Sequence, residues 1–401
     1  KAAARKPATG KSGAGKTGKR KAGAGRGETP PVPVIDTRPR RLREQPEGAP
    51  WNILFLGGSN TVMRNGYVDA LVASLEDRLG PVSRITNLAA GGNSTVHGLM
   101  LAMQQPDLAD YDIVVIEYGV NDVKLAKSDG IDAWKGATEG LVRRLLAARP
   151  DVHVVFALFG RQDMQKRYMF RPAESTVELA AHYAPTQRVT LVDIDHLFRD
   201  VLFRDQAEFA DLYVDRSHYR RPAIARLVGA LIASGILGAP TRAAAPLPEP
   251  LYPWHFAGAK LVDLVGDPET ARVFANSRYT VPARPIGLGE TVTIELPGAI
   301  VGIEFVAIPT AATLLLQEEG EAPVALHTRH ARTGEANYPF LLRCRALENR
   351  PWASGRRGPR KVVLEVVADA PEEQVKKGLN MVAAEPGTAE GIFLTRFLCI
   401  P

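Results

Sequence analysis

Short apolar runs alternate with amphipathic segments through the first half of the chain. Short segments, most of them mainly apolar, predict five strands, and the unbroken apolar run at 53–56 predicts a buried one; they span 53–56, 84–87, 113–118, 152–158 and 189–194. Apolar residues at three- and four-residue intervals predict helices between and after them, including 131–148, 174–183 and 222–234. Strands and helices alternating at this spacing predict an α/β fold with a doubly wound, five-stranded parallel sheet.

The pattern changes after an Ala- and Pro-rich stretch at 239–253. Helical periodicity becomes scarce, and strand-like segments follow with Gly, Pro and charged turns between them; they span 291–296, 300–308, 312–316, 361–367 and 391–400. We therefore expect an α/β domain over 51–238, a linker over 239–253, and an all-β sandwich domain over 254–401.

Residues 1–50 differ in composition from both predicted domains. Of the first 27 residues, nine are Lys or Arg and none is acidic, whereas the whole chain carries +6, so the remainder carries −3. We expect a disordered tail and lead-in, more a solubilising linker than a nucleic-acid or anionic-surface contact. The chain begins with Lys rather than Met, so the sequence leaves export and compartment open.

Two cysteines, Cys344 and Cys399, exclude a disulfide framework and a thiolate metal cage, while a single bridge between them stays open. No apolar run approaches the length of a membrane span. His327 and His330 have no third ligand nearby in sequence, so we expect no metal site.

Three loops that follow predicted strands carry candidate chemistry. They contain Ser59 after two glycines, the pair Gly91-Gly92, and Asn121. Ligands of open α/β sheets bind beyond the carboxyl ends of the strands, so these loops should converge on one crevice.

A serine becomes a strong nucleophile only when a base takes its proton. His218 is the best candidate base, because Asp215 lies three residues earlier and can orient and stabilise its imidazole. The backbone N–H groups of Ser59 and Gly92 and the side-chain amide of Asn121 could stabilise an oxyanion.

Each of these residues also has a purely structural interpretation. His218 could be an ordinary surface histidine, and Asn121 could cap the segment that follows it. Gly91 and Gly92 could serve only a tight turn. Asp122 is expected to make local contacts and is not assigned to the catalytic set.

Four segments in this order resemble the conserved blocks of the SGNH (GDSL-like) hydrolase superfamily, over about residues 51–238. They are Gly57-Gly-Ser-Asn-Thr61, Asn87-Leu-Ala-Ala-Gly-Gly-Asn93, Gly119-Val-Asn-Asp122 and Asp215-Arg-Ser-His218. The resemblance implies a flavodoxin-like sheet, no cofactor, and a serine esterase mechanism.

The same resemblance assigns residue roles. Ser59 would be the nucleophile, with His218 and Asp215 completing the triad. Gly92, rather than Gly91, and Asn121 would complete the oxyanion hole together with the Ser59 N–H. One position departs from the family, because its usual Gly-Asp-Ser is Gly57-Gly58-Ser59 here. The missing acidic residue takes no part in the proton relay, so catalysis is not excluded.

The substrate is less constrained by the sequence. Four arginines near the catalytic segments could favour an anionic or polyhydroxylated substrate or could be solvated surface charges; they are Arg64, Arg216, Arg220 and Arg221. By analogy, sandwiches appended to SGNH domains often resemble carbohydrate-binding modules. Four aromatic residues could stack on sugar rings or belong to the core: Trp254, Tyr279, Tyr338 and Trp352.

Three functions follow as hypotheses. The first is an esterase that removes an O-acyl group, in particular acetyl, from a carbohydrate through an acyl-enzyme. The second is an acyltransferase that uses the same triad, and the third is a glycan-binding protein without catalysis. The acyl group, the glycan and the oligomeric state are not specified by the sequence.

Overall fold

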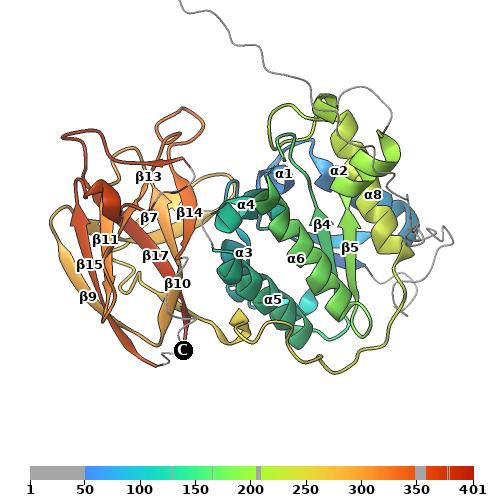
Figure 1. Ribbon diagram of the computed structural model, residues 1–401, viewed down its shortest axis with the longest axis horizontal. Helices are drawn as coiled ribbons and strands as arrows, with labels where there is room; N and C mark the ends of the chain where they lie inside the picture. Colours follow the sequence, from blue (N-terminus) through green and yellow to red (C-terminus); the bar gives the residue numbers. More distant parts are fainter. Residues whose placement is uncertain are drawn as a thin grey trace, which may run out of the picture. The chain divides into compact units, whose positions relative to one another are not determined.

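The computed structural model describes residues 50–127, 130–164, 166–204, 209–347, 358–376, 378 and 380–401 (Figure 1). The predicted tail, apart from Pro50, and the candidate aromatic residue Trp352 lie outside these ranges. The described residues all belong to one compact unit.

The first sheet has five parallel strands in the order β2-β1-β3-β4-β5. The strands are β1 (Trp51–Gly57), β2 (Val82–Asn87), β3 (Ile113–Glu117), β4 (His153–Leu158) and β5 (Val189–Asp193). This order reverses direction between β1 and β3, as in flavodoxin-like sheets. The predicted five-stranded parallel sheet is confirmed.

Helices cover both faces of this sheet (Figure 1). They are α1 (Ser59–Val62), α2 (Tyr67–Leu79), α3 (Thr95–Met103), α4 (Gly119–Lys127), α5 (Ile131–Ala148), α6 (Arg167–Tyr183), α7 (Ile194–His196) and α8 (Ala223–Gly238). In β1, Leu54 and Leu56 pack on the side of α3, α5 and α6, whereas Ile53 and Phe55 pack on the side of α2 and α8. Burial on both faces explains the unbroken apolar run at 53–56.

Short helical turns complete the description: η1 (Leu108–Asp110), η2 (Leu197–Leu202), η3 (Phe209–Leu212), η4 (Phe256–Gly258) and η6 (Glu372–Gln374). The helix predicted over 174–183 is part of α6, which begins seven residues earlier and contains Pro172.

The second half of the chain forms antiparallel sheets. Among the described residues, one sheet has the order β14-β10-β17-β8-β7 with β6 also paired to β17, a second has the order β12-β11-β15-β9, and β13 pairs with β16. Their bounds are β6 (Lys260–Asp263), β7 (Arg272–Ala275), β8 (Thr280–Gly287), β9 (Thr291–Leu296), β10 (Ala299–Ala307), β11 (Thr313–Glu318), β12 (Val324–His327), β13 (Arg329–His330), β14 (Leu341–Ala346), β15 (Arg360–Val367), β16 (Met381–Val382) and β17 (Gly391–Ile400).

The two larger sheets pack face to face on a shared apolar core. Phe305 of β10 and Phe397 of β17 meet Leu314 of β11 and Leu364 of β15 in this core. The predicted β-sandwich is therefore confirmed. Cys344 on β14 and Cys399 on β17 are both buried and free, which resolves the question of a bridge.

The segment 239–253 is fastened to the α/β domain. The buried carboxylate of Glu139 on α5 accepts the backbone N–H groups of Leu251 and Tyr252, both at 2.6 Å. Gln187 donates to the carbonyl of Pro246 at 2.9 Å. These bonds fix the backbone of this segment against the α/β domain.

Candidate functional site

Ser59 is the first residue of α1, directly after the turn that ends β1. The Gly58 N–H donates to the Glu117 carbonyl at 3.0 Å and to Glu117 Oε2 at 3.3 Å. A Cβ at Gly58 would lie 2.2 Å from Asn121 Nδ2, and one at Gly57 would lie 2.9 Å from the Glu117 carbonyl oxygen. A Cβ at Gly57 would therefore meet backbone, whereas one at Gly58 would displace the end of the Asn121 side chain.

The three residues predicted to form a triad are brought together. Ser59 Oγ lies 2.7 Å from His218 Nε2. His218 Nδ1 lies 2.7 Å from Asp215 Oδ2 and 2.9 Å from Asp215 Oδ1. This arrangement can transfer a proton from the hydroxyl to the imidazole and stabilise the resulting imidazolium.

Asp215 is exposed, with 54% of its side chain accessible. Partial burial raises its pKa, but hydrogen bonds from the His218 side chain and from the Ser217 N–H outweigh that effect and hold the pKa below its ordinary value. Asp215 is therefore ionised at neutral pH and able to hold the Nδ1 proton of His218.

The loop that carries His218 is tied to the nucleophile turn. Asn60 Nδ2, next to Ser59, donates to the Ser217 carbonyl at 2.9 Å. Within the loop, the Val214 N–H donates to the His218 carbonyl at 2.9 Å. These bonds explain how residues separated by more than 150 positions keep a hydrogen-bonding distance.

Glu117, at the end of β3, is a buried carboxyl group beneath the nucleophile turn. Its Oε2 accepts Thr61 Oγ1–H at 2.9 Å in addition to the Gly58 N–H. Burial raises its pKa to about 8, despite the opposing effect of these hydrogen bonds. No sequence motif pointed to this residue, although a single acid at the end of an apolar strand is a recognisable signal.

The loop containing Gly91 and Gly92 lies against the same turn. The Ala90 N–H donates to the Gly57 carbonyl at 3.0 Å, and a Cβ at Gly91 would lie 3.7 Å from the Ser59 Cβ. Gly92 has φ +72°, a conformation that favours glycine. Gly91 therefore borders Ser59, and Asn121 Nδ2 lies next to Gly58. The role of Gly92 and Asn121 as oxyanion donors stays a prediction.

Asp122 makes the local contacts expected of it. Its Oδ1 accepts the Thr95 N–H at 2.9 Å, and its Oδ2 accepts Thr95 Oγ1–H and Trp134 Nε1–H. Burial raises its pKa to about 7. These bonds join the start of α3, just beyond the glycine loop, to the helix that carries Asn121.

The β domain also contacts these loops, which the sequence did not indicate. Arg343 of β14 donates to the carbonyls of Gly91 and Gly92, and Arg278 donates to the carbonyls of Val62 and Ala89. Asn93 hydrogen-bonds the backbone of β14 through both ends of its side-chain amide. Within the sequence, neither arginine belongs to a recognisable motif.

The four arginines predicted to favour an anionic substrate are exposed. Arg220 Nε donates to the Asp211 carbonyl, and Arg221 Nη1 donates to the Arg64 carbonyl at 3.0 Å. The Arg216 carbonyl accepts the Gln162 N–H at 3.1 Å. Their role in substrate binding stays a prediction.

The other candidate residues have local partners. His327 Nδ1 lies 3.0 Å from Thr313 Oγ1, and His330 Nδ1 accepts the Arg332 N–H. Across the described ranges, no three His, Cys, Asp or Glu side chains gather where they could hold a metal ion. In that same part of the chain, no helix is long and apolar enough to cross a membrane.

Residues 55–252 match the GDSL-like Lipase/Acylhydrolase family. The chain therefore contains a domain of the GDSL-like lipase/acylhydrolase (SGNH) family, followed by an additional C-terminal β domain. The family match identifies the chain as an SGNH-family esterase. No curated protein matches the chain significantly.

Among solved structures, two crystal structures of a two-domain esterase (CEX) active on acetylated mannans resemble this chain, one of them co-crystallised with mannopentaose. Both are 16% identical in sequence, with TM-scores of 0.61 and 0.60, over 88% of this chain and 91% of theirs. At this identity the likeness shows a shared fold that includes both domains. An acetyl-xylooligosaccharide esterase from Geobacillus is 20% identical over 49% of this chain and 98% of its own, with a TM-score of 0.39.

Proposed function

We propose that this protein is a serine esterase that removes an O-acyl group, in particular acetyl, from a carbohydrate. The observation that carries the proposal is the chain of hydrogen bonds from Ser59 Oγ through His218 to Asp215, at 2.7 Å for each link. Ester hydrolysis through an acyl-enzyme uses a nucleophile, a base and an orienting carboxylate in this order.

In the first half of the reaction, Ser59 Oγ attacks the acyl carbon while His218 Nε2 takes its proton. The carbonyl oxygen becomes an oxyanion that accepts hydrogen bonds from the Ser59 and Gly92 N–H groups and from Asn121 Nδ2. The intermediate collapses by breaking the ester C–O bond, and His218 returns the proton to the departing sugar hydroxyl. The acyl group stays on Ser59.

In the second half, water attacks the acyl-enzyme and gives its proton to His218. The same donors stabilise the second oxyanion, and its collapse releases the carboxylic acid and restores the Ser59 hydroxyl. Asp215 stays ionised throughout and keeps the Nδ1–H of His218 in place. No cofactor is needed for either half.

A carbohydrate ester is supported by likeness to the two-domain esterase active on acetylated mannans, which extends over both domains. Because sequence identity is only 16%, this likeness supports a substrate class rather than a particular glycan.

The test is acetate release from p-nitrophenyl acetate and from acetylated manno-oligosaccharides by the wild type, Ser59→Ala and a matched control, Ser234→Ala. Ser234 lies on α8, where its hydroxyl donates to the Ala230 carbonyl. We expect Ser59→Ala to lower kcat by roughly 10⁴–10⁶ on both esters, and Ser234→Ala to behave as the wild type.

Turnover that survives in Ser59→Ala would disprove the mechanism. Ser59-dependent activity on p-nitrophenyl acetate alone would support the serine esterase mechanism and exclude acetylated manno-oligosaccharides as the substrate. If added manno-oligosaccharide acceptors take up acetyl faster than water does, the same triad serves acyl transfer instead.

A further inference from the structure

The guanidinium of Arg343 in the β domain binds the backbone of the loop that contains the proposed oxyanion glycine. Its Nη1 donates to the Gly91 carbonyl at 2.7 Å, and its Nη2 donates to the Gly92 carbonyl at 2.9 Å. Both are short, charge-assisted bonds, which are stronger than bonds between neutral groups. One side chain therefore holds two consecutive carbonyls.

Holding the Gly91 carbonyl also sets the direction of the Gly92 N–H. The peptide bond between these residues is trans, so its C=O and N–H point in opposite directions within one plane. A guanidinium on the carbonyl side therefore turns the N–H away from β14. A cation at the carbonyl also polarises the peptide, which makes its N–H a better donor.

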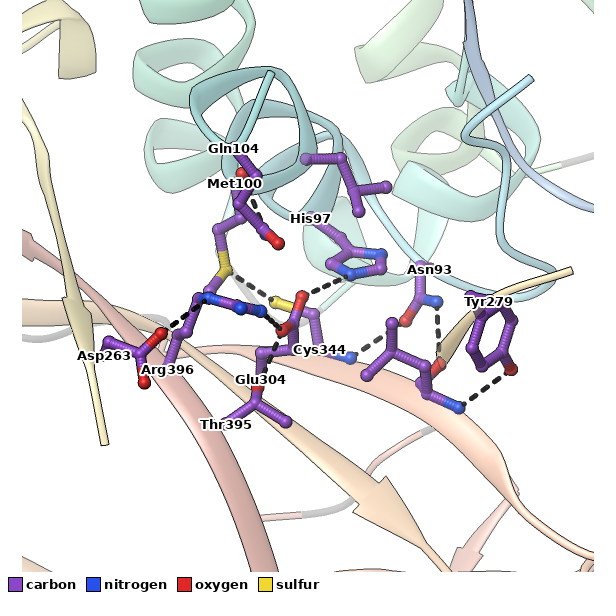
Figure 2. Close-up of polar contacts among 12 residues, drawn as sticks. Asn93, His97, Met100, Gln104, Asp263, Tyr279, Glu304, Cys344, Thr395 and Arg396 are labelled. Atoms are coloured by element: carbon purple, nitrogen blue, oxygen red, sulfur yellow. Dashed lines mark hydrogen bonds and ion pairs between the residues drawn. The ribbon is translucent and has the colours of Figure 1, made fainter. Parts of the chain in front are cut away.

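Arg343 cannot move far from this position. Asn93, the residue after Gly92, donates from Nδ2 to the Leu342 carbonyl at 3.2 Å, and its Oδ1 accepts the Cys344 N–H at 2.9 Å. These two bonds bracket Arg343 in the strand, and Figure 2 shows Asn93 beside Cys344 with Tyr279 close by. The Tyr279 hydroxyl accepts the Leu342 N–H at 3.4 Å, so this backbone donor of β14 also has a partner.

The close contact between Arg343 and the loop leaves no room for a residue larger than glycine at position 92. A Cβ at Gly92 would lie 2.8 Å from Arg343 Nη1, in addition to the strain expected at φ +72°. Arg343 is buried, and burial together with nearby Arg345 lowers its pKa to about 10, so it remains a cation at neutral pH. A buried cation held by backbone carbonyls is costly unless its geometry is maintained.

We propose that Arg343 is a positioning residue for the esterase reaction: by holding the Gly91 and Gly92 carbonyls it aims the Gly92 N–H at the oxyanion. This inference rests on the proposed function, because it requires the Gly92 N–H to be an oxyanion donor. It assigns the β domain a part in catalysis that is separate from binding a glycan.

The experiment compares Arg343→Gln and Arg343→Lys with Arg345→Gln in the full chain. Arg345 is a matched control, because it lies two residues further along the same strand and donates to the Lys376 carbonyl within the β domain. Initial rates on p-nitrophenyl acetate give kcat and KM, and thermal unfolding gives Tm. Ser59→Ala provides the background rate.

We expect Arg343→Gln to lower kcat by about 10–10³ while KM changes less than threefold, since an oxyanion donor acts mainly in the transition state. Arg343→Lys should lose less, because one ammonium keeps the charge but not the two-pronged geometry. In Arg343→Ala, millimolar guanidinium should restore part of kcat, whereas a purely structural role gives no such rescue.

The outcomes separate this inference from the proposed function. Wild-type turnover that does not depend on Ser59 overturns both. Ser59-dependent turnover with an unchanged kcat in Arg343→Gln overturns only the role of Arg343. Equal losses in Arg343→Gln and Arg345→Gln, or a loss in Arg343→Ala that guanidinium does not relieve, also overturn it. If Arg343→Gln fails to fold, Arg343→Lys provides the same comparison.

Discussion

Glycine at position 58 is explained by the atoms around it. The family's usual residue here is acidic, yet in this chain a Cβ at Gly58 would lie 2.2 Å from Asn121 Nδ2. The atom in the way is the end of a side chain, which can move at little cost in stability. Moving it, however, displaces the proposed oxyanion donor Asn121 Nδ2. A side chain at position 58 is therefore expected to affect catalysis more than stability.

We predict that Gly58→Ala lowers kcat by about 10–10³, the range expected when one oxyanion donor is lost. Gly58→Asp, which restores the family's residue, should be no better. Tm should fall by only a few degrees in either variant. Gly238→Ala is the control, because a Cβ there meets nothing within 4 Å. Steady-state kinetics check this, and a Gly58→Asp enzyme as active as the wild type would contradict it.

The Asp122 side chain links α4 to α3 and α5. It follows Asn121 on α4 and receives three hydrogen bonds from Thr95 and Trp134, on α3 and α5. Asp122→Ala leaves the buried N–H groups of both partners unpaired, so we predict a loss of about 2–4 kcal/mol in the free energy of unfolding. Urea denaturation measures this, and a loss below about 1 kcal/mol would show that α3 needs no such anchor.

Glu117 gives the junction between β3 and the β1 turn a pH dependence. Its pKa is about 8 in the folded protein and about 4.5 when unfolded, so between these values the folded state holds one more proton. Stability contributed by this group is fully present below pH 4.5 and is lost as the pH rises to 8. The slope is about 1.4 kcal/mol per pH unit.

We therefore predict that Glu117→Gln, which mimics the protonated acid, flattens the stability profile between pH 4.5 and 8. The wild type should lose stability over this window relative to the variant. Urea denaturation at several pH values measures both profiles. Parallel profiles would show that Glu117 is ionised in the folded protein at neutral pH.

The strands and loops of the α/β domain could be predicted because their signals are local. A mainly apolar segment such as 113–118 indicates a strand covered on both faces, and Ser59 and Asn121 lie within a few residues of strand ends. β14 is missing from the predicted strands because the contact that covers it is not local in the sequence. Arg343 and Arg345 alternate with apolar residues, a pattern typical of a solvent-facing strand, but Arg343 is covered by the glycine loop. Its partner lies about 250 positions away, where no local pattern indicates it.

Among the described residues, one apolar cluster extends across the two predicted domains. Val301, Cys344 and Leu398 of the sandwich belong to the same cluster as Val96 and Met100 of α3. Gly302 belongs to this contact, since a Cβ there would lie 2.9 Å from a Val96 methyl carbon. A shared core predicts that the domains unfold together, which makes the β domain part of the fold that supports the site.

A fully buried contact between a histidine and a carboxylate lies within this shared cluster (Figure 2). His97 Nε2 of α3 lies 2.9 Å from Glu304 Oε2 of β10, and Glu304 Oε1 accepts bonds from Thr395 Oγ1 and Arg396 Nη1. Burial alone would raise the pKa of Glu304, but these partners lower it to about 2. Its carboxylate therefore joins the two domains while it is ionised.

The pKa of Glu304 is depressed from 4.5 to about 2. The stability that its ionised carboxylate contributes is therefore present above pH 4.5 and is lost as the pH falls towards 2. We predict that Glu304→Gln lowers the free energy of unfolding by about 3 kcal/mol at pH 7, and by much less at pH 3. Calorimetry at both values measures this and also shows whether one transition becomes two. Glu365→Gln on the exposed side of β15 is the control. A difference between variant and wild type that is equal at both pH values would mean that packing, rather than the ionised carboxylate, holds the domains together.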